Sequence, residues 1–178
     1  DHRSALLEDK DRTIRAYVVG GKDVLKTWER NRNVVILLPD EYGWRSKPSR
    51  VFADEIAFYN QVIVMVPDVL AGSAFTNFDT DTEDSVSYSE WIDTRSRAVE
   101  KNRIFDDVVA SLFYGKKQYD ASTLSLVGLG VGGGIALDTA STLATIESMS
   151  GIQFSSPKES HKKSHSLDLD QGVEWDEF

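Results

Sequence analysis

Cysteine is absent from this chain of 178 residues. Without a thiol, the chain can form no disulfide bond, no thiolate metal site and no cysteine nucleophile. Long apolar runs are absent too. The longest, at 34–38 and 62–66, have the length of strands, whereas a membrane-spanning helix needs roughly 18 apolar residues. The sequence therefore predicts no membrane span and none of the functions that depend on cysteine.

Positive charge is also in short supply. Lys and Arg number 20 against 29 Asp and Glu, which gives a formal net charge of -9. A nucleic-acid-binding protein needs a basic face to replace the counterions of the phosphates, and a protein that docks on an anionic membrane needs one as well. We therefore expect no nucleic-acid partner, and we interpret the acidity as a contribution to solubility.

The apolar residues alternate between runs typical of buried strands and runs with helical spacing. Residues 33–39 and 61–68 are continuous apolar runs, as in strands that are buried on both faces of a parallel sheet. Residues 49–60 between them have helical spacing, so the three segments predict a β-α-β unit. Weaker patterns predict strands at 14–19, 124–127 and 152–154, helices at 100–114 and 135–149, and a helical turn or strand edge at 23–30.

Together these segments predict one α/β domain of three layers, with a mostly parallel sheet and helices on both faces. We expect this domain to span residues 13–156, after a loose, charged lead-in at 1–12 and before a polar, acidic tail at 157–178. Residues 70–98 form a polar connection that is long for a compact domain. Such a connection is either functional or mobile, and Trp91 within it requires burial.

The two ends of the chain carry separate information. The first residue is Asp1 and not Met, which predicts either a fragment or the removal of a targeting segment, as in an organellar or secreted protein. Beyond residue 157, Ser, Lys, His and Asp replace the apolar residues, a composition typical of disorder. Trp175 and Phe178 make this tail a candidate docking element.

Residues 128–134 form a glycine-rich turn between a predicted strand and a predicted helix. The pattern Gly128-x-Gly130-x-x-Gly133 matches the dinucleotide-binding fingerprint, in which glycines let the backbone approach a pyrophosphate at the helix N-terminus. The ribose-binding acid should lie at the end of the next strand, whereas Glu147 precedes any such strand. A dinucleotide-binding module is therefore one alternative for this turn.

The same turn also fits the nucleophile elbow, G-x-Nuc-x-G, which lifts a nucleophile above the end of a strand. Gly128 and Gly132 occupy the flanking positions, and Gly130 occupies the position of the nucleophile. Glycine tolerates the strained dihedral angles of such a turn, but it has no side-chain atom with which to attack. This interpretation predicts an elbow that cannot carry out acyl transfer.

Four motifs, in this order, resemble the dienelactone hydrolase family, particularly its eukaryotic branch, over residues 33–140. They are Val34-Val-Ile-Leu-Leu-Pro-Asp40-Glu-Tyr-Gly43, similar to a strand followed by acid-x-x-Gly; Arg50-Val-Phe-Ala53-Asp54-Glu-Ile-Ala57, similar to the family's "ADxxA" helix; Val64-Met-Val-Pro67-Asp68, similar to its strand that ends in Pro-Asp; and Gly128-Leu-Gly130-Val-Gly132-Gly133, similar to its G-x-C-x-G-G elbow. The resemblance implies a partial α/β-hydrolase fold and, for the family, hydrolysis of carboxylic esters or lactones.

The resemblance carries over few catalytic residues. The family's nucleophile is a cysteine, sometimes a serine, and the matching position here is Gly130. An acid that modulates the nucleophile corresponds to Asp40, which would be vestigial; Asp40 could instead cap the turn after its strand, and we favour the cap. The triad Asp and His come later in the family's chain order. After Gly130 this sequence offers only a helix, one short strand and the polar tail.

The remaining candidates have structural interpretations. Asp68 is expected to fix the exit of the loop after its strand. Ser125 lies inside a strand and is no candidate nucleophile. His161 and His165 are spaced by four, but they lie in a solvated segment without further ligands. The stripe made by Phe105, Val108, Val109, Leu112 and Phe113 is typical of core packing and not of a cofactor site. We therefore predict no metal and no cofactor.

These observations lead to one leading hypothesis and two alternatives. The leading hypothesis is a dienelactone-hydrolase-like protein that is catalytically inactive and acts as a structural or binding subunit of a larger assembly. A partner chain or an unseen C-terminal half would cover the sheet edge and the apolar helix faces that so short a version of the fold exposes. The alternatives are an active ester or lactone hydrolase seen incompletely and the dinucleotide-binding module.

Overall fold

The computed structural model describes residues 3–9, 12–20, 33–75 and 87–150. Several predictions from the sequence lie outside these residues. They concern the segment 23–30, the strand at 152–154, the tail with Trp175 and Phe178, and the histidines His161 and His165. These stay predictions.

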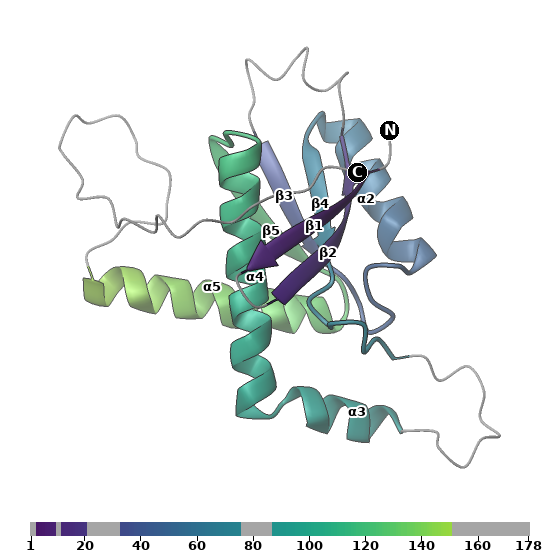
Figure 1. Ribbon diagram of the computed structural model, residues 1–178, viewed down its shortest axis with the longest axis vertical. Coiled ribbons are helices and arrows are strands. Elements are labelled where there is room, and N and C mark those ends of the chain that lie inside the picture. The colour runs from purple at the N-terminus through teal and green to yellow at the C-terminus, as the bar shows by residue number, and fades with distance from the viewer. Residues whose placement is uncertain (1–2, 10–11, 21–32, 76–86, 151–178) are drawn as a thin grey trace.

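The centre of the described part is a five-stranded sheet with the strand order β1-β2-β4-β3-β5 (Figure 1). The strands are β1 (Arg3–Asp9), β2 (Arg12–Val19), β3 (Asn33–Leu38), β4 (Ile63–Pro67) and β5 (Thr123–Gly128). β3 pairs in parallel with both β4 and β5, whereas β2 pairs antiparallel with β1 and with β4. The strand predictions at 14–19, 33–39, 61–68 and 124–127 are confirmed.

Side chains alternate between the two faces of the sheet, as the two-residue repeat of a strand requires. Val34, Ile36 and Leu38 of β3 belong to one core cluster, and Val35 and Leu37 belong to the other. Residues 34–38 and 63–67 are buried throughout. This double burial explains why both strands read as continuous apolar runs in the sequence.

Helices cover both faces, so the expected three-layer α/β architecture is confirmed. The helices are α2 (Lys47–Asn60), α3 (Tyr88–Arg95), α4 (Ala98–Gln118) and α5 (Val131–Ser150). α2 packs Ala53 and Ala57 on one face of the sheet. α4 and α5 cross each other on the opposite face, and α3 leads into the lower end of α4 (Figure 1).

Local sequence explains where these helices begin. Ser46 accepts a hydrogen bond from the backbone N–H of Ser49 and so caps α2. Pro48 suits the first turn because proline lacks a backbone N–H, and an N–H at this point of a helix has no intrahelical acceptor. Ser87 and Glu90 form a reciprocal capping box at the start of α3. A helix was not predicted at this point, and the pair Ser87-x-x-Glu90 is the sequence signal that indicates it.

Two further expectations need correction. Residues 3–9 form β1, although a loose lead-in was expected for 1–12; the pairing with β2 supplies the hydrogen bonds that hold this charged segment extended. In α4, Phe113 is 50% exposed and lies outside the core, whereas Ile104, Asp107, Val108 and Ser111 are buried. The apolar residues of the sequence therefore predicted a buried face of α4 that is slightly rotated from the one observed. The reason is that two of the buried residues, Asp107 and Ser111, are polar.

Candidate functional site

The glycine-rich turn lies where a nucleophile elbow requires it, between the end of β5 and the start of α5. β5 ends at Gly128 and α5 begins at Val131. Gly130 between them has a φ of 49°, in the left-handed region that strains residues with a side chain. Leu129 donates its backbone N–H to the carbonyl oxygen of Leu38 at 3.0 Å, which fixes the turn beside the end of β3.

The flanking glycines are required by close backbone contacts. A Cβ atom on Gly132 would lie 2.5 Å from the carbonyl oxygens of Leu38 and of Pro39. A Cβ atom on Gly128 would lie 2.2 Å from the carbonyl oxygen of Gly132. The Gly-x-Gly-x-Gly pattern therefore reflects the packing of the turn itself, in the same way as the flanking glycines of an elbow.

Two consecutive acidic residues face the central glycine from the end of β3. A Cβ atom on Gly130 would lie 2.8 Å from Oε2 of Glu41 and 3.3 Å from Cβ of Asp40. The structure thus brings Gly130 and Asp40 together, as the resemblance implied. It also brings Glu41, which was not singled out from the sequence, and it is the carboxylate of Glu41 that reaches the nucleophile position.

The carboxyl group of Asp40 is engaged in the turn that leads into α2. Its Oδ1 accepts a hydrogen bond from the backbone N–H of Tyr42 at 3.2 Å and one from Oγ of Ser49 at 3.5 Å. Burial raises the pKa of Asp40, and the hydrogen bond from Tyr42 opposes this effect. The contacts agree with the capping role that we favoured for Asp40.

Glu41 belongs to a loop that is fixed to an aromatic cluster. Its carbonyl oxygen accepts a hydrogen bond from the backbone N–H of Phe75 at 2.7 Å. Phe75, Tyr88 and Trp91 form the cluster, with ring centroids 5.3 to 6.0 Å apart. Trp91 is 7% exposed, so its expected burial is confirmed, and its Nε1 donates to the carbonyl oxygen of Ser73 at 2.9 Å.

A groove lies between α3, α4 and α5. Its volume is about 720 Å³, a size typical of small-molecule sites. The apolar side chains that line it are Leu70, Ile92, Ile104, Phe105, Val131 and Ile135. Val131 and Gly134, in the first turn of α5, both line the groove, whereas Gly130 is not among its lining residues. The groove is also lined by polar side chains, which include the hydroxyl groups of Ser96 and Thr139 and the amide group of Asn102.

An ion-pair network holds α4 against the segment after β4. Arg103 binds Asp107 at 2.7 Å and Glu100 at 3.0 Å, and it donates to the carbonyl oxygen of Val69 at 3.2 Å. Arg95 of α3 also binds Glu100, at 3.1 Å. The hydrogen bond from Arg103 holds the pKa of Glu100 below its usual value. This network fixes the groove wall and does not enter the elbow.

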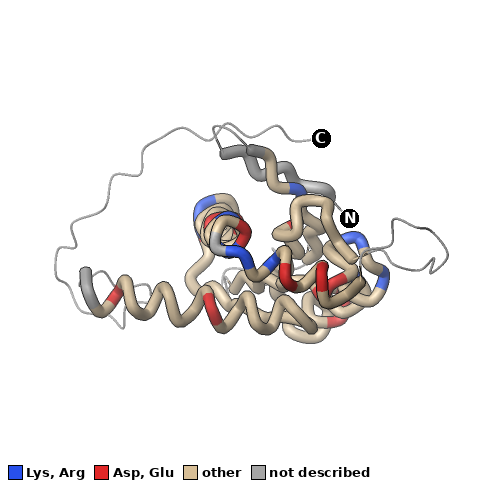
Figure 2. Tube along the Cα trace, turned by 90° about the horizontal axis from the view of Figure 1, so that it is seen from below, with Lys and Arg blue, Asp and Glu red and all other residues tan. Residues whose placement is uncertain are grey.

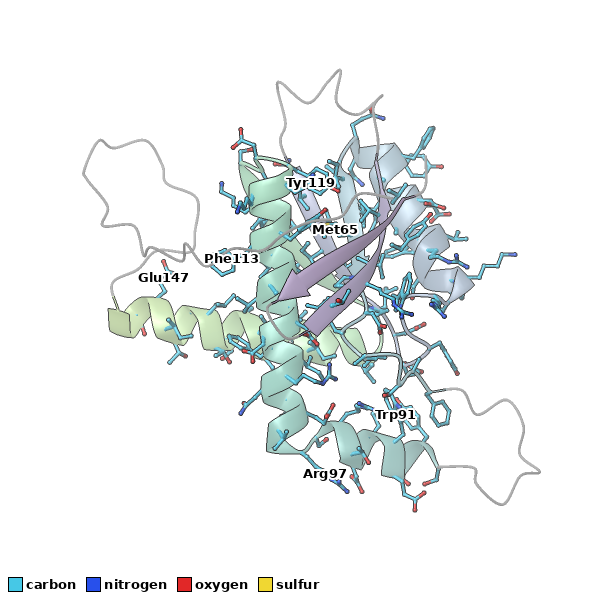
Figure 3. The ribbon with its side chains drawn as sticks, viewed as in Figure 1. Met65, Trp91, Arg97, Phe113, Tyr119 and Glu147 are labelled. Atoms are coloured by element: carbon cyan, nitrogen blue, oxygen red, sulfur yellow. The ribbon has the colours of Figure 1, made fainter. Side chains whose placement is uncertain are left out.

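The other residues considered from the sequence lie apart from the elbow or support loops. Asp68 accepts the backbone N–H of Gly72 at 3.1 Å, which fixes the loop after β4 as expected. Ser125 lies within β5. Glu147 lies near the far end of α5 (Figure 3), about 24 Å from Val131 at a rise of about 1.5 Å per residue. Among the described residues, no group of three or more His, Asp or Glu side chains could hold a metal ion.

No helix in the described ranges combines the length and the apolar character that crossing a bilayer requires. A comparison with family models matches residues 14–167 to the dienelactone hydrolase family. No curated protein matches the chain.

Two solved structures show the same fold at low sequence identity. A dienelactone hydrolase from Anabaena variabilis is 14% identical, with a TM-score of 0.52, and the alignment covers 82% of this chain and 59% of that one. A dienelactone hydrolase-like promiscuous phosphotriesterase from metagenomic libraries is 19% identical, with a TM-score of 0.56, and the coverage is 80% and 54%. The chain thus spans little more than half the length of these neighbours.

Proposed function

The chain belongs to the dienelactone hydrolase family, and we propose that it acts there as a binding or structural subunit that does not carry out acyl transfer by itself. One observation carries this proposal: the elbow has its strained φ and its crowded flanking glycines, but its centre is Gly130. Covalent catalysis requires a nucleophilic side chain with a base beside it. A hydrogen atom at this position cannot attack an acyl carbon.

The proposed role requires a partner, and the outer side of the sheet beyond β5 is the surface that would receive it. Among the described residues, β5 pairs only with β3, and within this part of the chain no strand lies at its other edge. β5 is only partly buried, in contrast to β3 and β4. We call this edge, together with the exposed face of α5, the assembly surface.

α5 has the composition of a buried helix but the exposure of a surface helix. Asp138 and Glu147 are its charged residues in a stretch of 20, and Figure 2 shows the long uncharged intervals between them. Leu137 is 74% exposed and Ile146 is 39% exposed. Because a surface helix normally carries charges on its outer face, we interpret α5 as a helix that another polypeptide covers in the functional assembly.

The main alternative is an active ester or lactone hydrolase. The limited coverage of the structural neighbours leaves room for further chain that could supply an acid and a base. In that case another residue would have to replace the nucleophile, and Glu41 is the side chain nearest to the vacant position.

An esterase assay distinguishes the inactive subunit from the active hydrolase. The full-length protein is incubated with p-nitrophenyl acetate and with a dienelactone, and the expected rate equals that of buffer alone. Turnover that disappears in Glu41→Gln, with no change in folding by circular dichroism, would establish the active alternative and end the inactive proposal.

A dinucleotide-binding module is the second alternative, and it is favoured only by the spacing of the glycines. Glu147 has about the expected spacing of roughly 20 residues after the first glycine of the turn, but it lies in α5 and not at the end of a following strand, where the ribose-binding acid is expected. Fluorescence titration of the chain with NADH tests this function. We expect no saturable binding.

A further inference from the structure

The groove between α3, α4 and α5 has an apolar floor that lies apart from the elbow. Its lining follows α5 from Val131 to Thr142 and does not include Gly130. Trp91 of α3 and Phe105 of α4 line its other walls. A large apolar surface of this kind normally marks a place where another group binds. Since the elbow does not account for the groove, the groove requires an occupant of its own.

The rim of the groove favours an anion. Arg95 and Lys101 line it, and Asp138 is the only acid among its lining residues. Lys101 and Asp138 are 4.0 Å apart and exposed, so their mutual attraction is weak. Arg95 binds Glu100 through Nη1, whereas its Nε has no hydrogen-bond partner among the described residues. Arg97 adds an exposed cation where α3 meets α4 (Figure 3).

The sequence contains one segment that complements both the floor and the rim. Residues 167–178, which we call the acidic segment, read Leu-Asp-Leu-Asp-Gln-Gly-Val-Glu-Trp-Asp-Glu-Phe, with five acids and no Lys or Arg. Apolar and acidic residues alternate through much of it. Because successive side chains of an extended peptide point to opposite sides, such a sequence can present apolar groups to a floor and carboxylates to a rim. The family match ends at residue 167, so this pattern is not part of the family's fold.

We propose that the acidic segment binds in the groove of its own chain. Trp175 and its apolar neighbours contact the floor, and the carboxylates lie beside Lys101 and Arg97. This inference goes beyond the proposed function and does not depend on it, because the elbow takes no part in the contact. It also gives a role to the docking element that the sequence indicated at Trp175 and Phe178.

The connection between α5 and the acidic segment is long enough for this contact. α5 ends at Ser150, about 12 Å beyond Thr142 and about 28 Å beyond Val131 at a helical rise of about 1.5 Å per residue. The 16 residues 151–166 reach at most about 53 Å, and a flexible polar chain of this length has a root-mean-square span of roughly 22 Å. This span falls between the two ends of the groove, which favours binding within one chain.

Proteolysis of the full chain measures how often the acidic segment leaves the groove. Endoproteinase Glu-C cuts after Glu174 and releases residues 175–178, and mass spectrometry follows this one product. At low protease concentration, the rate reports the fraction of chains in which the segment is free. We expect Arg97→Gln with Lys101→Gln to raise the rate about fivefold, as the loss of two exposed charge interactions predicts. A high salt concentration should raise the rate of the native chain as well.

The matched control for charge is Arg45→Gln with Lys47→Gln. Both residues are exposed, at the start of α2 on the other face of the sheet, and both double variants lose the same charge without adding a cleavage site. We expect this control to be cut at the native rate. Equal rates for the native chain and for Arg97→Gln with Lys101→Gln would overturn the proposal. A higher rate in the α2 control alone would also overturn it, because the segment would then bind elsewhere.

A second pair of variants tests the apolar floor. Phe105→Ala should raise the rate of cleavage after Glu174, whereas Phe113→Ala should not, since Phe113 is 50% exposed in the same helix and does not line the groove. Circular dichroism checks that both variants fold. Protection that is lost on dilution would assign the groove to the acidic segment of a second copy and would refute binding within one chain. Esterase turnover by the native protein would refute the proposed function alone and leave these rates unaffected.

Discussion

The carbonyl oxygen of Gly132 lies 2.2 Å from the position that a Cβ atom on Gly128 would take. The three atoms nearest to this position all belong to the backbone of Gly132 and Gly133, so no side chain can move aside to make room. We predict that Gly128→Ala destabilises the fold by about 3 kcal/mol, at the upper end of overpacking costs. The measurement is the free energy of unfolding from urea titration. Gly134→Ala is the control: its Cβ meets nothing within 4 Å, and alanine in a helix should stabilise by about 0.5 kcal/mol.

The hydroxyl group of Tyr17 donates to Oδ1 of Asp54 at 2.6 Å and joins β2 to α2. Tyr17→Phe should reduce stability at pH 7 by about 1.5 kcal/mol, since the lost hydrogen bond has a charged acceptor. Tyr59→Phe is the control, because Tyr59 is 78% exposed. A loss of equal size in both variants would show that the Tyr17 hydrogen bond contributes nothing specific.

The same tyrosine predicts a dependence of stability on alkaline pH. Burial and the hydrogen bond with Asp54 raise the pKa of Tyr17 above its ordinary value of 10.0. Its contribution is therefore fully present below pH 10 and is lost as the pH rises further, because the unfolded chain releases the proton first. Urea titrations between pH 9 and 11 should show a smaller fall of stability for Tyr17→Phe than for the native chain. Parallel curves would contradict this assignment.

The pKa of Asp40 is raised, chiefly by burial, above the ordinary value of 3.8. Its contribution to stability is thus present below pH 3.8 and is lost as the pH rises through the pKa of the folded state. Asp40→Asn keeps an oxygen acceptor for the N–H of Tyr42 without the charge. We expect this variant to be more stable than the native chain at pH 7 and equal to it at pH 3.

Asp107 is 1% exposed and binds Arg103 at 2.7 Å. Arg103→Met removes this charged partner and the contact with the carbonyl oxygen of Val69, and it should destabilise the fold by about 3 kcal/mol, as for other buried pairs that lose one member. Lys101→Met is the control, since the Lys101–Asp138 pair is 4.0 Å apart and exposed, and such pairs contribute less than about 1 kcal/mol. Chemical denaturation distinguishes the two.

Leu137 is 74% exposed on the assembly surface. Leu137→Asp should leave the stability of the isolated chain nearly unchanged, because little apolar area is lost from its core. If α5 is covered in the functional assembly, the same variant should shift the protein purified from its natural host to a lower mass in analytical ultracentrifugation. Phe58→Asp, at a position 71% exposed on the opposite face, should not. An unchanged mass for Leu137→Asp would remove α5 from the proposed interface.

Local patterns in the sequence were sufficient for much of the fold. The apolar runs around Val35 and Val64 are long enough, and bounded sharply enough, to predict β3 and β4, and helical spacing predicts α2 between them. The burial of α4 was harder to predict, because hydropathy assigns polar residues to the surface. Asp107 and Ser111 are buried nonetheless, since Arg103 and the helix's own backbone satisfy them.

The sequence by itself determined that the centre of the glycine-rich turn has no nucleophile, because the identity of Gly130 needs no coordinates. It also indicated the turn, since the spacing of the glycines is a local property. Only the tertiary structure decided which acid faces that turn. Asp40 and Glu41 are adjacent in a turn after β3, which the hydrogen bond from the N–H of Gly43 to the carbonyl oxygen of Asp40 closes, so the choice between them depends on how this turn lies against the start of α5. That contact joins segments about 90 residues apart, and no local pattern encodes its direction.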